Sequence, residues 1–345
     1  MPSKMHPINT NILITNTMRS GSSYLSRLIS AHSKISMTYD TLNFFRFGYG
    51  KYDNIDDLNN FTRLINDFAF RLKNRFGINI NAEVCLSQTR GHQLTYALAN
   101  NVILRQIYPD SKKTCLGDQE SLVWTKIPQY LEMYKNGKII IIARDPRDVV
   151  NSFRKITIAP ENDYLIALFN AIDIVDKAMK YAKELPKNVH FLTFENLKLH
   201  TEREARKIVS FLELDFEDQM LDSNTYTDHF GKPWDDLKSR SRPEEQNPMA
   251  AVGRWQTNID PVDLFLTEWL CKNQITKMGL ELSNTKFDQD TFEEGIRRLM
   301  SSPLLKEAFH KLISSGEGSE KFPLNPVDPS NWDPKGVKNK MAFEK

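Results

Sequence analysis

The sequence predicts an α/β protein built on a P-loop-like, doubly wound parallel sheet that is flanked by helices. Two observations lead to this fold class. Short runs rich in β-branched residues alternate with amphipathic helical segments along most of the chain. One run, residues 138–143 (KIIIIA), carries four isoleucines in a row, as expected for a strand buried on both faces of a parallel sheet. With 345 residues and 40% hydrophobic content, the chain has enough apolar material for a core without covalent staples.

The predicted elements follow one another in strand-then-helix order. Residues 11–18 are expected to form the first strand, and residues 21–31 a helix, because the apolar side chains of the second segment fall on one helical face. The other expected strands are 35–40, 138–143 and 189–194. The other expected helices begin at Pro146 and cover 201–212, 262–278 and 288–313, with helical insertions near 58–74, 90–106 and 159–185.

The end of the chain departs from this pattern. Four prolines between Phe322 and Lys340 forbid regular structure there. We therefore expect one domain over residues 1–315 and an irregular C-terminal extension over residues 316–345, which is either draped over the domain or disordered.

Charge and cysteine content exclude several classes of protein. The 46 basic and 44 acidic residues leave a net charge of +2, so a globally basic nucleic-acid binder is not expected. Cys85, Cys115 and Cys271 lie far apart, which disfavours a disulfide framework and a structural zinc site and predicts a reducing, cytoplasmic setting. No segment has the roughly 18 uninterrupted apolar residues of a membrane span. The sequence gives no sign of the oligomeric state.

The first candidate anion site lies between the first strand and its helix. Arg19 adds a positive charge, Ser20, Ser22 and Ser23 add hydroxyls, and Gly21 lets an oxyanion approach the backbone at the helix N-terminus. The motif GxxxxGK[ST] is absent, so this is not a nucleoside-triphosphate loop. An ordinary serine-rich helix cap would look the same.

The second candidate anion site follows the isoleucine-rich strand. Arg144 stands at the carboxyl end of that strand, where open α/β sheets bind ligands, and Asp145 and Pro146 begin a helix that carries Ser152. A capped helix with solvated charges is the plainer interpretation. Two strand-to-helix anion sites in one sheet favour a ligand with phosphates at both ends.

These motifs resemble those of the sulfotransferases that use 3'-phosphoadenosine 5'-phosphosulfate (PAPS), over about residues 11–280. The loop 19–23 is similar to the family's 5'-phosphosulfate loop, and Arg144 with Ser152, eight residues later, to its 3'-phosphate segment. A third segment, 251–255, is similar to the late loop that closes over the nucleotide. The resemblance implies PAPS as the sulfuryl donor, in-line transfer to a hydroxyl or amine acceptor, and no metal ion.

Further residue roles follow from the same resemblance. Arg254 would reach a phosphate, Ser239 would belong to the closing loop, and Phe194 would lie against the adenine, although a plain core role for Phe194 fits equally well. The nature of the acceptor cannot be read from the sequence: a sugar, a peptide tyrosine, a lipid and a small alcohol all remain open.

The run that begins at Arg19 is closest in pattern to the tyrosylprotein and carbohydrate-type enzymes of the family. Their catalytic base is a carboxylate 21 residues after the loop arginine, which corresponds here to Asp40. His92 is a weaker candidate base, and we expect His32 to pack or cap. By this resemblance Arg19 and the loop amides neutralise the leaving phosphate while Asp40 accepts the acceptor's proton.

One position departs from the family pattern. Relatives often carry a lysine 25 residues before the second motif's arginine, and Gln119 stands there in this chain. Lys126, two helical turns on, is the candidate replacement, although it is also well explained as a solvated lysine. Two other functions therefore remain open: a small-molecule or nucleotide kinase with a degenerate phosphate loop, and a protein that binds a nucleotide without turning it over.

Overall fold

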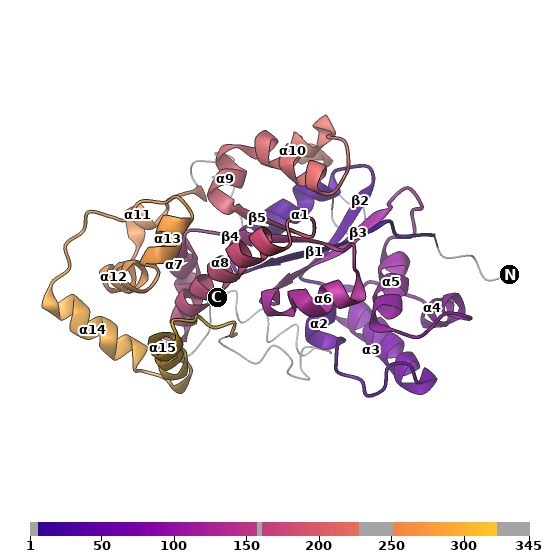
Figure 1. The fold of residues 1–345 in the computed structure, drawn as a ribbon, viewed down its shortest axis with the longest axis horizontal. Helices are drawn as coiled ribbons and strands as arrows, with labels where there is room; N and C mark the ends of the chain where they lie inside the picture. Colours follow the sequence, from indigo (N-terminus) through magenta and orange to yellow (C-terminus); the bar gives the residue numbers. More distant parts are fainter. Residues whose placement is uncertain (1–5, 157–160, 228–250, 323–345) are drawn as a thin grey trace.

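A computed structural model describes residues 6–156, 161–227 and 251–322 of the chain. Its centre is a five-stranded parallel sheet in the order β2-β3-β1-β4-β5 (Figure 1). The strands are β1 (Thr10–Asn16), β2 (Ile35–Tyr39), β3 (Cys115–Ser121), β4 (Lys138–Ala143) and β5 (Val189–Thr193). This confirms the predicted fold class.

Helices cover both faces of the sheet (Figure 1). Ile12 and Ile14 of β1 pack on one face, and Leu13, between them, packs on the other, as the two-residue period of a strand requires. The first face is covered by α1 (Ser22–Ser30), α9 (Phe194–Leu199) and α10 (Thr201–Phe211), and the second by α6 (Ile127–Met133) and α8 (Ile166–Glu184).

Two helical lobes extend the sheet at opposite ends of the molecule (Figure 1). The first, inserted between β2 and β3, consists of α2 (Phe44–Phe47), α3 (Leu58–Phe76), α4 (Ala82–Gln88) and α5 (Tyr96–Ile107). The second packs on α7 (Pro146–Ile156) and consists of α11 (Trp255–Asn258), α12 (Pro261–Leu270), α13 (Lys272–Lys277), α14 (Gln289–Leu299) and α15 (Pro303–Ser315). Each lobe has its own apolar cluster.

The sequence prediction missed one strand. β3 is buried but carries Asp118, Gln119 and Glu120 in succession, each at most 5% exposed. A strand whose buried side chains are polar gives neither an apolar run nor an alternating pattern, so periodicity cannot find it.

The predicted helix boundaries were wrong at three places. The expected helix 288–313 is two helices, because Ser302 caps a new helix that starts at Pro303. The expected helix 262–278 is interrupted at Cys271. The insertion expected near 90–106 starts only at Tyr96, where Thr95 caps it.

The segment after α15 lies along α8. The Ser319 amide donates to Phe169 O at 3.0 Å, and the Lys321 amide donates to Asn170 Oδ1 at 2.8 Å. Glu320 accepts hydrogen bonds from the amide and hydroxyl of Thr125. Residues 323–345 of the predicted extension lie outside the described residues.

Candidate functional site

The loop between β1 and α1 has the backbone shape of an anion site. Arg19 (φ 71°) and Gly21 (φ 84°) are both left-handed, and no side chain of the described residues caps α1. The Thr17 and Ser20 hydroxyls hydrogen-bond across the turn and hold it closed. The amides at the start of α1 and the hydroxyls of Ser22 and Ser23 therefore stand beside the positive end of the helix.

Gly21 is required here by both conformation and space. A Cβ at Gly21 would lie 2.2 Å from Cδ2 of Phe194, whose ring forms one wall of the loop. The sequence prediction placed Phe194 in a strand, but β5 ends at Thr193 and Phe194 begins α9. Its ring also lies 4.6 Å from the Arg144 guanidinium. Phe194 is thus a buried wall residue, and its contact with adenine stays a prediction.

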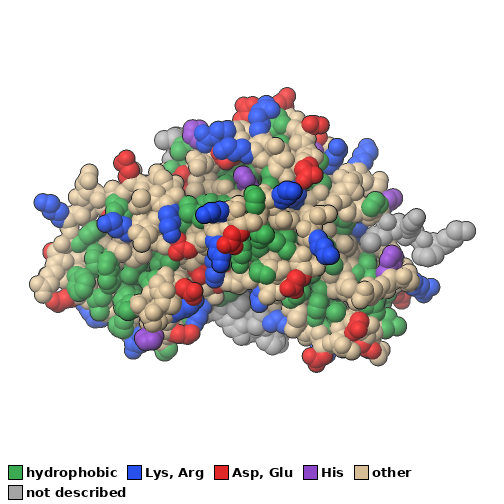
Figure 2. Space-filling view, viewed as in Figure 1, with side chains coloured by type: hydrophobic (Ala, Val, Ile, Leu, Met, Phe, Trp, Pro, Cys, Tyr) green, Lys and Arg blue, Asp and Glu red, His purple; other side chains and the backbone are tan. Residues whose placement is uncertain are grey.

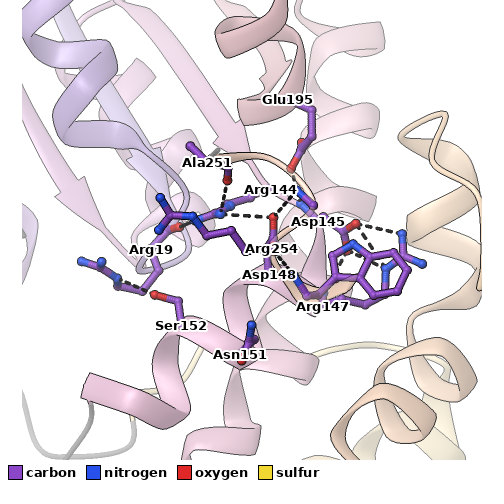
Figure 3. Close-up of polar contacts among 12 residues, drawn as sticks. Arg19, Arg144, Asp145, Arg147, Asp148, Asn151, Ser152, Glu195, Ala251 and Arg254 are labelled. Carbon is purple, nitrogen blue, oxygen red and sulfur yellow. Dashed lines mark hydrogen bonds and ion pairs between the residues drawn. The ribbon is translucent and has the colours of Figure 1, made fainter. Parts of the chain in front are cut away.

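The two predicted anion motifs meet in space (Figure 3). Arg144 donates from Nη1 to the carbonyl of Arg19 at 3.2 Å, and Arg19 Nε donates to Ser152 Oγ at 3.1 Å. The Nε atom of Arg144 is buried and has no partner among the described residues. A buried guanidinium nitrogen without a partner is costly, and a bound anion would satisfy it.

Asp148 is a central residue of the site that sequence reasoning missed. Its Oδ2 accepts from Arg144 Nη2 at 3.1 Å and from the Gly253 amide at 3.0 Å, and its Oδ1 accepts from the Trp255 amide at 2.8 Å. Burial raises the pKa of Asp148, and the charge of Arg144 opposes that rise. Asp148 therefore joins α7 to the segment 251–255. The available signal was its place in the first turn of the predicted helix, four residues after Arg144.

Arg147, the second arginine of the motif, is structural. It is 2% exposed, pairs with Asp145 at 2.8 Å and Glu268 at 2.7 Å, and lies 3.8 Å from the Trp255 ring. Asp145 accepts from the Arg147 amide at 2.9 Å, which confirms it as the cap of α7. Its own amide donates to Glu195 at 2.9 Å, and burial raises the pKa of Glu195 to about 7.

The third predicted motif, residues 251–255, lies within the described residues. Arg254 is the N-cap residue of α11, and Figure 3 shows its side chain beside that of Arg144. Ala251 of the same segment accepts from Arg144 Nη2 at 2.7 Å. Ser239 lies outside the described residues.

Asp40 follows β2 at the carboxyl edge of the sheet, the same edge that carries the loop 17–21 and Arg144. It is exposed and left-handed (φ 50°), and its amide donates to Gln119 O at 3.1 Å. In contrast, His92 is exposed in the loop between α4 and α5. His32 is 2% exposed and hydrogen-bonded to the backbone through both ring nitrogens, which confirms the expected packing role.

Gln119 and Lys126 lie in different surroundings. Gln119 is buried in β3 and donates to Asn16 Oδ1 at 2.9 Å, and Asn16 in turn donates to the carbonyl of Thr17. Gln119 thus supports the backbone of the loop 17–21 through Asn16. The exposed side chain of Lys126 forms no hydrogen bond or ion pair with the other described residues, so its catalytic role stays a prediction.

Within the described residues, no cluster of His, Cys, Asp or Glu could hold a metal ion. No helix in those ranges has the length and apolar content needed to cross a membrane. The three cysteines are buried free thiols.

Comparison with known proteins gives one family. The model of the sulfotransferase family matches residues 11–218. No curated protein matches the chain. Solved structures to which the chain is similar include the sulfotransferase domain from the curacin biosynthetic pathway, at 17% identity and a TM-score of 0.47, covering 81% of this chain and 100% of that chain. The sulfotransferase domain of the Synechococcus PCC 7002 olefin synthase has 16% identity and a TM-score of 0.49 (82% and 98% covered). A mouse sulfotransferase complexed with PAP has 15% identity and a TM-score of 0.43 (85% and 90% covered).

The matched region spans more than half of the sequence and contains the loop 19–23, Asp40 and the Arg144–Ser152 segment. These residues lie at one edge of the parallel sheet, and Arg19, Arg144 and Ser152 are in contact there. The chain therefore belongs to the sulfotransferase family.

Proposed function

We propose that this chain transfers a sulfuryl group from PAPS to a hydroxyl or amine acceptor, in line and with Asp40 as general base. The observation that carries the proposal is the meeting of Arg19, Arg144 and Ser152 at the mouth of the left-handed loop. Two guanidinium groups, one with a buried free nitrogen, and the N-terminus of α1 suit a ligand with several phosphate groups.

The residues present fit such a donor. Arg19 and the amides at Ser22 and Ser23 would hold the 5'-phosphosulfate end, and Arg144 with Ser152 the 3'-phosphate. Gly21 leaves the space that a Cβ would fill, and Arg254 would approach from the segment held by Asp148. PAPS supplies the activated sulfuryl group, and the positive side chains stabilise charge that grows on the phosphate.

Asp40 would take the acceptor's proton. Its position at the carboxyl edge of β2, two strands from β1, supports this role, and its exposure leaves room for an acceptor. An aspartate with an ordinary pKa near 3.9 is a weak base, so proton transfer must be late in the reaction or the bound acceptor must raise that pKa. The acceptor class stays open.

The test uses labelled PAPS and a mixed acceptor extract, with mass analysis of the sulfated product. Arg144→Ala should weaken PAP binding, because a charge-assisted contact is lost, while Asp40→Asn should keep PAP binding and lower turnover about a hundredfold. Asp56→Asn, at an exposed residue between α2 and α3, is the matched control and should behave like the parent. Failure of both PAPS turnover and PAP binding in the parent would overturn the proposal.

The other functions are less well supported. The family match favours sulfuryl transfer over a kinase activity. A protein that binds the nucleotide without turning it over would show PAP binding but no labelled product. The cytoplasmic location stays a prediction from the cysteine spacing.

A further inference from the structure

The N-cap residue of α2 does not cap its helix. Asn43 is left-handed (φ 51°) and 2% exposed, and its side chain makes no capping hydrogen bond. An asparagine at this position usually accepts from the second or third amide of the helix. Other residues cap this helix, so the side-chain amide of Asn43 can make a different contact.

Two buried carboxylates of β3 take over the capping. Asp118 Oδ2 accepts from the Phe44 amide at 3.2 Å. Glu120 accepts from the Phe45 amide at 3.0 Å and from the Arg46 amide at 2.7 Å. The first three amides of α2 are therefore fixed to the central sheet.

The segment between β2 and α2 is also held by α3, through its backbone carbonyls. Arg71 of α3 is 1% exposed and donates from Nη1 to the carbonyls of Thr41 and Leu42. With its amides held by β3 and its carbonyls by α3, the backbone from Asp40 to Arg46 has little freedom. This is the arrangement expected where a side chain must be aimed.

The side-chain amide of Asn43 lies between Asp40 and Arg46. Its Oδ1 accepts from Arg46 Nη1 at 3.2 Å, and its Nδ2 stands 3.5 Å from Asp40 Oδ1. A guanidinium can only donate, so Arg46 fixes which end of the amide carries the oxygen. The NH₂ group must then face Asp40.

We propose that Asn43, oriented by Arg46, is a positioning residue that aims the Asp40 carboxylate and keeps it ionised. The idea deepens the proposed function, because it rests on Asp40 as the base. Among the described residues, the other charged groups that act on Asp40 include Arg71 and Arg75 from α3 and Asp118 from β3. Asn43 differs from them in that its NH₂ group lies against the carboxylate itself, with Nδ2 at 3.5 Å from Asp40 Oδ1, a long hydrogen bond.

The decisive variant is Asn43→Asp. It keeps the left-handed conformation and an oxygen for Arg46, but it replaces the NH₂ group that faces Asp40 with a second carboxylate oxygen. A like charge at this distance should raise the midpoint of Asp40 ionisation by about one pH unit or more. Asn43→Gly, which also tolerates the backbone, removes the contact without adding charge and should raise it less, by about half a unit.

The measurement is the ¹³C titration of the aspartate carboxyls in the full chain, with Asp40 assigned by the signal lost in Asp40→Asn. Asn54→Asp is the matched control, because Asn54 is also left-handed (φ 47°) and lies on an exposed loop. An unchanged Asp40 midpoint in Asn43→Asp would overturn the positioning role, with folding checked by melting temperature. This readout needs no acceptor, whereas normal turnover of Asp40→Asn overturns the base assignment instead, so the two failures are distinguishable.

Discussion

Arg19 donates from Nε to the hydroxyl of Ser152 at 3.1 Å, although 133 residues separate the two in the sequence. The sequence prediction assigned Arg19 to one end of the donor and Ser152 to the other. Their contact shows that the two anion motifs adjoin each other. A change in either motif should therefore weaken binding of the whole proposed donor.

Ser152→Ala should weaken PAP binding about tenfold or more, because a hydroxyl that would meet a charged phosphate is lost. Titration calorimetry with PAP measures the effect. Ser210→Ala, on an exposed turn of α10, should leave the affinity at the parent value. Equal affinities for Ser152→Ala and the parent would remove Ser152 from the donor site.

Gly21→Ala should lower the free energy of unfolding by about 2–4 kcal/mol, because a left-handed alanine is strained and its Cβ would strike the Phe194 ring. Gly50→Ala separates the two causes: Gly50 is left-handed (φ 69°), but nothing lies within 4 Å of its Cβ position. It should lose only about 1 kcal/mol in urea denaturation. Equal losses would mean that Phe194 moves aside without cost.

Asp148→Asn should weaken PAP binding about tenfold, because its NH₂ group would replace either the oxygen that accepts from Arg144 and the Gly253 amide or the oxygen that accepts from the Trp255 amide, and the charge that pairs with Arg144 is lost. PAP titration is the measurement. Asp222→Asn, at an exposed 3-10 turn, serves as the control. Unchanged PAP affinity in Asp148→Asn would show that the segment 251–255 contributes nothing to donor binding.

Stability should fall as the pH rises from about 5 to 8. Burial raises the pKa of Asp118 to about 7 and of Glu120 to about 8, above their unfolded values near 4, so the native state binds more protons across this window. The contribution of these two carboxyls to the free energy of unfolding is complete below pH 4. It is lost as the pH rises through their native-state pKa values. Urea denaturation of Glu120→Gln should show a smaller loss between pH 5 and 8. The same slope in parent and variant would contradict the burial effect.

If Lys126 replaces the missing family lysine, Lys126→Ala should lower turnover about ten- to a hundredfold and change donor affinity little, because it would meet charge that grows only in the transition state. If Gln119 serves instead as a neutral donor, Gln119→Lys should speed the reaction. Steady-state rates with labelled PAPS distinguish these outcomes. Parent-like rates for both variants would leave Arg19 and the loop amides to handle the leaving phosphate.

Local sequence was enough for much of the fold and for the anion motifs. The isoleucine run of β4 and the glycine and serines before α1 carry signals that depend only on near neighbours. Asp118, Glu120 and Asn43 could not be found in this way. Their roles arise from contacts between β3 and α2, and a buried carboxylate in a strand has no periodicity that distinguishes it from a loop residue.

The wall that Phe194 gives to the loop at Gly21 also bears on how the donor site is assembled during synthesis. The loop, its wall, Ser152 and the carbonyl of Ala251 come from four stretches of the chain. A nascent chain that has emerged only as far as α8 has the loop residues without the ring that packs on them. The donor proposed above would therefore find its complete site only after Ala251 has been synthesised, and earlier folding would proceed without help from that ligand.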